Sequence, residues 1–291
     1  MFEGLSTALI TPFRDDAIDE TALRELVERQ IAAGVDQLVP CGSTGESATL
    51  SHFEHGKVIE IVVSAARGRV GVLAGTGSNN TREAIELTQH AKAVGADGAL
   101  LISPYYNKPT QQGIYEHYRA IAEQTQFPLV TYNIPGRTGS NIAPSTLARL
   151  ADVPHIVGVK EACGDIGQIA EVVARCHEEF AVLSGDDALN LSIMAIGGKG
   201  AISTASNVAP EGVGELVRAC RDNDIARARK LHYRLLPLFE VLFLETNPIP
   251  VKCALELMGL IGSAEVRLPL TPITEANRER LQVVLKELGQ L

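Results

Sequence analysis

The sequence has no hydrophobic run that approaches the roughly 20 residues that a membrane-spanning helix needs. Its N-terminus, Met1-Phe2-Glu3-Gly4, lacks the basic and apolar regions of a secretion signal. Cysteine is scarce, and the five cysteines are scattered without a Cys-x-x-Cys pair, as expected for reduced thiols. These absences predict a cytoplasmic protein with no membrane partner.

Positive charge is also in short supply. The 291 residues include 26 lysines and arginines against 35 acidic residues, so the formal net charge is −9. Such an acidic chain is poorly suited to nucleic acid or to an anionic membrane surface. A small anionic substrate is still compatible with this balance, because a few local basic groups are enough to hold a carboxylate.

Short β-branched runs alternate with helix-periodic segments over the first 224 residues. We expect strands at residues 5–10, 37–40, 70–74, 99–102, 129–132, 156–160, 181–184 and 201–203. Helices are expected at residues 19–33, 51–67, 81–94, 111–124, 144–150, 166–176, 189–196 and 210–222, with a capping box at Ser51 to Glu54. Eight strand–helix units predict an α/β fold, a parallel (β/α)8 TIM barrel. A doubly wound open sheet is the alternative, because periodicity does not show closure.

The remainder of the chain, residues 225–291, contains no strand-like run. Three helical stretches are separated near Asn247-Pro248 and at residues 267–272. We therefore expect a barrel catalytic domain at 1–224 and a C-terminal helical region at 225–291 that packs on the barrel. No linker is long enough to suggest an independent domain.

Polar clusters follow the expected strands at their carboxyl ends, where the active site of a parallel barrel lies. These clusters are Ser43-Thr44, Gly75-Thr76-Gly77, Tyr105-Tyr106-Asn107, Tyr132 to Arg137, Lys160 and Asp186-Asp187. Loops that face one mouth of the barrel would bring them together, and this convergence favours catalysis.

Lys160 directly follows Ile156-Val157-Gly158-Val159, which has the sequence of a buried strand. An amine at the end of such a strand is partly desolvated, which lowers its pKa and leaves more free amine to attack a carbonyl. The alternative is a structural lysine that reaches out to solvent. Tyr132 at another strand end suits a proton carrier or a packing tyrosine. Arg137 in the following loop suits a bidentate grip on a carboxylate or a solvated position.

Gly42 to Glu46 suits a small anion cradle or a simple tight turn, and it lacks the lysine of a nucleotide-binding P-loop. His52 and His55 form a His-x-x-His pair on an expected helix, but no third ligand has a suitable spacing. We therefore predict no metal site. Asp186-Asp187 is interpreted as a turn and helix cap rather than a catalytic carboxylate pair.

Three motifs together resemble the dihydrodipicolinate synthase family of the pyruvate-dependent class I aldolase superfamily. They are Gly42-Ser43-Thr44-Gly45-Glu46, Tyr132-Asn133-Ile134-Pro135-Gly136-Arg137-Thr138-Gly139 and Gly158-Val159-Lys160-Glu161. The resemblance runs over nearly the whole chain and agrees with the barrel and the lysine nucleophile.

The resemblance implies that Lys160 forms a Schiff base with pyruvate. The enamine would condense with L-aspartate 4-semialdehyde to give 4-hydroxy-tetrahydrodipicolinate, on the path to lysine and diaminopimelate. It implies proton relay by Thr44, Tyr132 and the Tyr106 of a neighbouring subunit. It assigns substrate binding to Ser43, Thr44, Arg137 and Ile202. Because the imine acts as the electron sink, no cofactor or metal is implied.

Arg137 and Tyr105-Tyr106-Asn107 favour the synthase over the alternative, a sugar-acid lyase similar to N-acetylneuraminate lyase. Ser43 stands where synthases more often have threonine, and Gly136 replaces a frequent serine, which should loosen the loop that carries Arg137. A third hypothesis is a non-catalytic barrel that senses a keto acid, although such a binder has no need of a nucleophile with a proton relay.

The family resemblance also implies regulation and assembly. The residues that match a lysine feedback site are Ser47, Ala48, His52, His55, Asn79, Glu83 and Tyr105. They predict inhibition by L-lysine, or else they are ordinary polar residues at an interface. The implied assembly is a homotetramer built as a dimer of dimers.

Overall fold

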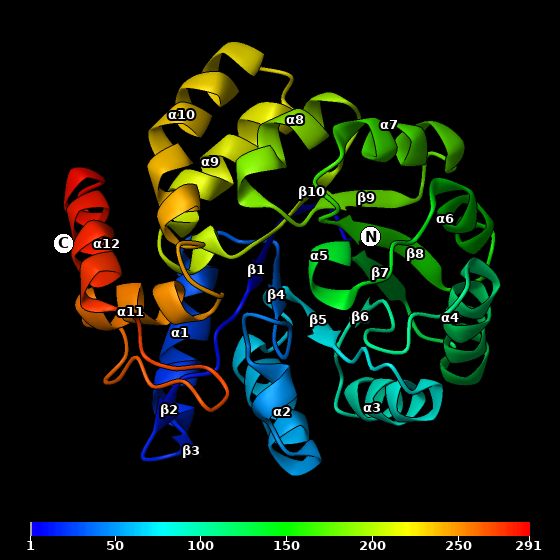
Figure 1. The fold of residues 1–291 in the computed structure, drawn as a ribbon, viewed down its shortest axis with the longest axis horizontal. Helices are drawn as coiled ribbons and strands as arrows, with labels where there is room; N and C mark the ends of the chain where they lie inside the picture. Colours follow the sequence, from blue (N-terminus) through cyan, green and yellow to red (C-terminus); the bar gives the residue numbers. More distant parts are fainter. Residues whose placement is uncertain (1) are drawn as a thin grey trace.

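The computed structural model describes residues 2–291. Met1 lies outside the described residues; it is the first residue of the expected barrel domain and of the N-terminal segment that lacks the features of a secretion signal. Within this range, eight parallel strands close into a barrel in the order β1-β10-β9-β8-β7-β6-β5-β4 (Figure 1). The strands are β1 (Gly4–Ala8), β4 (Gln37–Val39), β5 (Gly71–Gly75), β6 (Gly98–Ile102), β7 (Leu129–Asn133), β8 (Ile156–Glu161), β9 (Ala181–Ser184) and β10 (Gly200–Ser203). β1 pairs with both β4 and β10, which confirms the TIM barrel and rules out the open sheet.

Helices surround the barrel on its outside. They are α1 (Glu20–Ala32), α2 (His52–Ala66), α3 (Thr81–Ala93), α4 (Gln111–Thr125), α6 (Pro144–Ala151), α7 (Ile166–Arg175), α8 (Asn190–Ala195) and α9 (Pro210–Arg221). The predicted capping box at the start of α2 is confirmed, because Ser51 accepts from the Glu54 N–H and the Glu54 carboxylate accepts from the Ser51 N–H at 2.9 Å.

The strands place alternate side chains in two apolar layers, as a period of two requires. Residues such as Leu73, Leu100 and Val130 fill the inside of the barrel, and the larger layer lies between the strands and the helices. In β8, Val159 belongs to the outer layer, so Lys160 points into the barrel. The fold therefore puts this amine among inward-facing side chains.

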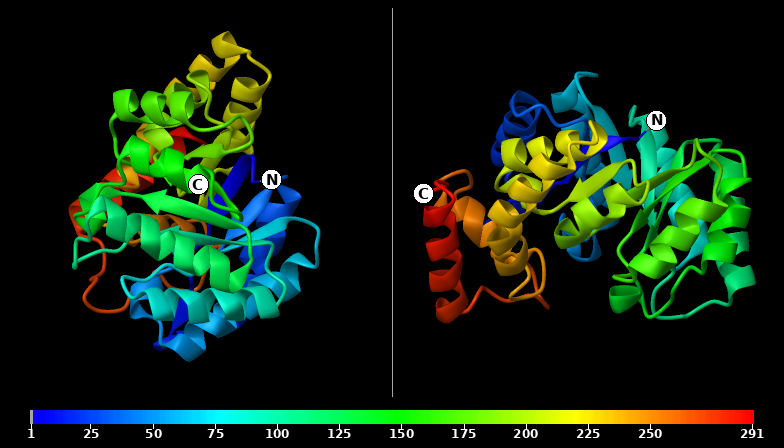
Figure 2. Two further views of the ribbon diagram at one scale, coloured as in Figure 1. Left: turned by 90° about the vertical axis from the view of Figure 1, so that its right-hand side faces the viewer. Right: turned by 90° about the horizontal axis from the view of Figure 1, so that it is seen from above.

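Three helices follow the barrel: α10 (Ile225–Val241), α11 (Ile249–Leu257) and α12 (Glu275–Glu287). α10 packs against α9, and α12 contacts both α10 and α11. Figure 2 shows α12, in red, at the outer side of this group and away from the barrel strands. Across residues 2–291, no helix combines the length and the apolar character needed to cross a membrane.

The structure also contains elements that the sequence did not predict. A small antiparallel hairpin, β2 (Phe13–Arg14) with β3 (Ala17–Ile18), follows β1, which ends at Ala8 rather than at residue 10. Arg137 lies in a short helix, α5 (Pro135–Thr138), and the expectation of a loop there was wrong. Proline at the first helical position favours this turn, because its φ is already helical.

Candidate active site

Lys160 and Tyr132 lie side by side at the carboxyl ends of β8 and β7. They are direct partners in the register of the two strands. The Lys160 Nζ lies 4.4 Å from the centroid of the Tyr132 ring. Both residues are only 6% exposed, so the amine sits in a largely water-free environment at the barrel mouth.

The surroundings of Lys160 favour its neutral form. Burial lowers the pKa of Lys160 to about 8, while the carboxylates of Asp187 and Asp186 act in the opposite direction and Arg137 adds to the lowering. A larger share of neutral amine is therefore present near pH 7 than for an exposed lysine. This is the property that attack on a carbonyl requires.

The phenol of Tyr132 is held in its neutral form. Burial raises the pKa of Tyr132 to about 12, and the positive charge of Arg137 and a hydrogen bond with Ser43 partly offset this rise. The neutral O–H can donate a proton and accept one in turn, so Tyr132 suits a proton carrier beside the amine.

Gly185, directly after β9 (Ala181–Ser184), makes room for the side chain of Lys160. A Cβ at Gly185 would lie 2.8 Å from Lys160 Cε and 2.9 Å from its Cγ, closer than real contacts allow. The Gly185 N–H donates to the carbonyl oxygen of Glu161 at 2.7 Å, which fixes this close approach. Sequence reasoning missed Gly185, because the contact joins different strands.

Thr44 is buried and hydrogen-bonded by two residues that the sequence did not single out. Asn247 Nδ2 donates to Thr44 Oγ1 at 2.9 Å, and the hydroxyl oxygens of Thr44 and Thr204 lie 3.3 Å apart. Because Thr44 Oγ1 accepts from Asn247, its own proton is free to point to Thr204 or into the site. Asn247 precedes Pro248, and the sequence marked this pair only as a break between helices.

The other expected substrate-binding residues lie around the same mouth. Ser43 and Arg137 line a cavity of about 450 Å³ together with Asn247. Arg137 is exposed, and its Nη2 donates to the carbonyl oxygen of Asn247 at 3.4 Å. Ile202 is 1% exposed and lies in the inner apolar cluster that includes Tyr132. The structure therefore gathers Ser43, Thr44, Tyr132, Arg137, Lys160 and Ile202 at one end of the barrel.

Tyr106 is not brought into this group within the protomer. Its side chain is 88% exposed and its backbone has a left-handed φ of 71°. A role for Tyr106 in the site of a neighbouring subunit stays a prediction from the family resemblance.

The two aspartates after β9 have structural partners. Asp186 accepts from the Ala188 N–H at 3.0 Å and caps a short 3-10 helix, Asp187–Leu189. Asp187 accepts from the backbone N–H groups of Thr204 and Ala205 at 3.0 and 2.8 Å. The interpretation as a turn and cap is confirmed, and the negative charges additionally act on Lys160.

The residues expected to bind lysine gather beside the substrate-binding residues. The cavity that Ser43 and Arg137 line also has walls from Ser47, Ala48, His52, His55, Glu83 and Tyr105. Asn79 is outside this lining, but its Nδ2 donates to the Tyr105 carbonyl oxygen at 3.2 Å. All seven residues are therefore close to one another in a single protomer.

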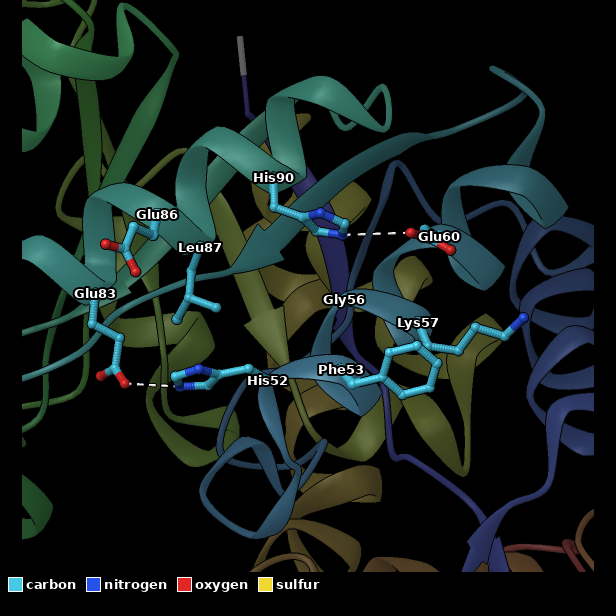
Figure 3. Close-up of a pocket in the computed structure, with 9 residues that line it drawn as sticks. All are labelled: His52, Phe53, Gly56, Lys57, Glu60, Glu83, Glu86, Leu87 and His90. Carbon is cyan, nitrogen blue, oxygen red and sulfur yellow. Dashed lines mark hydrogen bonds and ion pairs between the residues drawn. The ribbon is translucent and has the colours of Figure 1, made fainter.

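His52 and Glu83 already pair across the groove between α2 and α3. Their Nε2 and Oε1 atoms lie 2.8 Å apart, and Figure 3 shows the two side chains pointing at each other. Hydrogen bonds from Ser78 and His52 lower the pKa of Glu83 despite its burial, so its carboxylate is charged at neutral pH. Burial lowers the pKa of His55 to about 4, which leaves this imidazole neutral.

The closed barrel and the buried amine at its carboxyl end define a class: a (β/α)8-barrel enzyme with a group suited to carbonyl chemistry. Comparison with known proteins narrows this class. The profile of the Dihydrodipicolinate synthetase family matches residues 1–288.

A 4-hydroxy-tetrahydrodipicolinate synthase from Nitratidesulfovibrio vulgaris (strain DSM 19637 / Miyazaki F) is 54% identical over 289 residues, with 99% of each chain covered. A crystal structure of a chloride-inhibited dihydrodipicolinate synthase from Acinetobacter baumannii, complexed with pyruvate, superposes with a TM-score of 0.98 at 45% identity over 100% of both chains. A DHDPS from Cyanidioschyzon merolae with lysine bound superposes with a TM-score of 0.97 at 40% identity, over 100% of this chain and 99% of that one.

The chain therefore belongs to the dihydrodipicolinate synthetase family. It is an enzyme, a lyase with 4-hydroxy-tetrahydrodipicolinate synthase activity in the biosynthesis of lysine and diaminopimelate. The family resemblance seen in the sequence is confirmed at full length.

Proposed function

We propose that this enzyme condenses pyruvate with L-aspartate 4-semialdehyde through an imine on Lys160. The observation that carries the proposal is the buried amine of Lys160 beside the Tyr132 ring, with its pKa lowered to about 8 by burial. The pyruvate complex of the Acinetobacter baumannii relative supports the choice of keto acid.

In the proposed reaction, the lone pair of Lys160 Nζ attacks C2 of pyruvate, and the carbonyl oxygen leaves as water to give the imine. Loss of a proton from C3 gives the enamine, whose C3 attacks the aldehyde carbon of the second substrate. The amino group of that substrate then attacks C2, closes the ring and displaces Lys160. The net products are 4-hydroxy-tetrahydrodipicolinate and water.

Each step moves protons. Ring closure does so too, because the attacking amine gives up its protons while the departing Lys160 nitrogen takes one up. The residues around Lys160 suit this task. Tyr132 is the neutral O–H beside the amine, and Thr44 provides a second hydroxyl whose orientation Asn247 holds. Ser43 and Thr44 would bind the carboxylate of pyruvate by donating hydrogen bonds to it. The exposed guanidinium of Arg137 would hold the carboxylate of the second substrate in a bidentate contact.

A sugar-acid lyase is the alternative function, and the two are separated by substrate profiling. The synthase is expected to turn over pyruvate with L-aspartate 4-semialdehyde and to leave N-acetylneuraminate uncleaved. Cleavage of the sugar acid at the higher rate would contradict the proposal. A keto-acid sensor would bind pyruvate without turnover.

L-Lysine is the proposed inhibitor. The shared cavity offers a charged Glu83 carboxylate for an ammonium group. It is also lined by His55, whose neutral ring donates its one N–H to the Gly75 backbone and leaves the other nitrogen as a hydrogen-bond acceptor. The lysine-bound relative from Cyanidioschyzon merolae supports this choice of effector. Saturating lysine should lower the initial rate, and an unchanged rate would contradict the proposal.

Paired variants test which residues bind lysine. Glu83→Gln removes the proposed charge partner, so it should weaken inhibition by lysine. Glu86→Gln changes a glutamate on the same helix that lines only the neighbouring groove of Figure 3, so it should leave inhibition unchanged. Equal effects of both variants would show that the site is elsewhere.

The proposal extends to assembly and location. The exposed Tyr106 supports a homotetramer, a dimer of dimers, in which this tyrosine completes the neighbouring site. Residues 1–224 would form the catalytic barrel and residues 225–291 the helical region packed on it. The five free cysteines support a reducing, cytoplasmic compartment. Sedimentation of the wild type and of Tyr106→Phe reports the oligomeric state of each. If the two assemble alike, any loss of activity in Tyr106→Phe is due to the missing hydroxyl and thus to proton transfer.

A further inference from the structure

The turn that carries Ser43 and Thr44 ends on a buried ion pair that the proposed mechanism does not use. The carboxylate of Glu46 pairs with the ammonium of Lys252 on α11. The two side chains are 1% and 0% exposed, so the pair is closed off from solvent.

Every polar partner of this pair is fixed by the fold. The second oxygen of Glu46 accepts from the Arg267 backbone N–H at 3.1 Å. Lys252 Nζ also donates to the Glu265 carbonyl oxygen at 2.8 Å and lies 4.0 Å from the centroid of the Phe13 ring. A buried pair tolerates little movement, because each charge loses its solvation and depends on the geometry of its partners.

The backbone at Glu46 makes the pair relevant to the turn. Glu46 has a left-handed φ of 53°, a conformation that a residue with a side chain adopts only when its surroundings require it. Its N–H donates to the Ser43 carbonyl oxygen at 3.2 Å. A shift of the Glu46 side chain would therefore move the turn that carries Ser43 and Thr44.

The same C-terminal segment reaches the site at two more points. Asn247 donates to Thr44 Oγ1 at 2.9 Å, and Arg137 donates to the carbonyl oxygen of Asn247 at 3.4 Å. Residues 247–267 therefore contact both carboxylate-binding elements of the proposed site. Among these connections, the Glu46–Lys252 pair is the one that joins two buried charges.

We infer that Glu46 and Lys252 are positioning residues that hold the Ser43–Thr44 turn in the shape that binds the carboxylate of the keto acid. This inference rests on the proposed function, because it assumes that this turn receives pyruvate. It gives α11 a role in substrate affinity in addition to its packing. A pair that only stabilised the fold would leave the affinity for pyruvate unchanged in any variant that folds.

The test measures imine formation against pyruvate concentration, by borohydride trapping and intact mass, in the full-length protein. Lys252→Met leaves Glu46 without its partner, and Glu46→Gln/Lys252→Met removes both charges together. Arg278→Met is the matched control, because it breaks the ion pair between Arg278 and Glu256 at 3.2 Å, which also involves α11 but does not touch the turn.

Lys252→Met should raise the pyruvate concentration for half-maximal trapping by about tenfold or more, as expected when a buried charged contact is lost. Trapping at saturating pyruvate should remain complete, because Lys160 is unaltered. The steady-state KM for pyruvate should rise with it while kcat changes little. Arg278→Met should keep the half-maximal concentration of the wild type.

The double variant covers the case in which Lys252→Met does not fold. It should fold and still need about tenfold more pyruvate, because a neutral pair no longer fixes the turn. Half-maximal trapping at the wild-type concentration in either folded variant would overturn the inference. Loss of trapping even at saturating pyruvate would also overturn it, because the effect would then not be confined to the turn. Failure of the proposed function is distinguishable, since the wild-type protein itself would give no adduct.

Discussion

Gly185→Ala is expected to damage the active site by pushing Lys160 out of place. The added Cβ would lie 2.8 Å from Lys160 Cε, 2.9 Å from Lys160 Cγ and 3.0 Å from Ala162 Cβ. Carbon atoms settle at about 3.5–4.0 Å, so the lysine side chain has to move by roughly 1 Å. A displacement of this size at a reacting group lowers catalysis by about a hundredfold.

The variant should be folded but somewhat less stable, since overpacking of this kind costs about 1–3 kcal/mol. The assay compares kcat/KM and the rate of borohydride trapping with pyruvate, while thermal unfolding reports the fold. Gly212→Ala is the control, because its added Cβ lies 3.4 Å from Leu235 in ordinary contact. Wild-type trapping and kcat/KM in folded Gly185→Ala would refute the account of how Lys160 is positioned.

Other predictions address protonation, orientation and substrate contacts. With the pKa of Lys160 at about 8, the initial trapping rate should rise with pH and reach half its maximum near pH 8; a midpoint above pH 10 would contradict the effect of burial. Lys160→Met should abolish trapping and raise the free energy of unfolding at pH 7 by about 3 kcal/mol, because the lysine pKa is lower in the folded state and the protonated amine is therefore disfavoured there. An unchanged unfolding free energy by urea denaturation would refute this. Asn247→Ala should lower kcat/KM about tenfold by freeing the Thr44 hydroxyl, with wild-type kinetics as the contrary result. Arg137→Lys should raise KM for L-aspartate 4-semialdehyde more than KM for pyruvate, because lysine lacks the bidentate fork.

The barrel could be predicted because each strand–helix unit has a local signal of its own. β8 and β7 were predicted from their β-branched runs, and the polar residues at their ends were correctly expected to converge. Closure could not be predicted, because it depends on the pairing of β1 with β10, about 200 residues apart in the chain. The helix α5 was missed because a four-residue segment is too short to show periodicity.

The site was predictable in its chemistry and less so in its supports. Lys160, Tyr132 and Thr44 have functional groups that can be recognised by residue type. Asn247 acts on Thr44 across 203 positions of the chain, so the contact exists only after folding. Gly185 likewise has no functional group, and its importance lies in the space that it leaves for Lys160.

The most direct test of the central claim is borohydride reduction of the wild-type enzyme in the presence of pyruvate, read by intact mass and peptide mapping. Lys160→Ala is the control, because it removes the amine. The account predicts one pyruvate adduct per chain, located on Lys160 and absent from the control. A folded wild-type protein without an adduct, or with the adduct on another lysine, would contradict it.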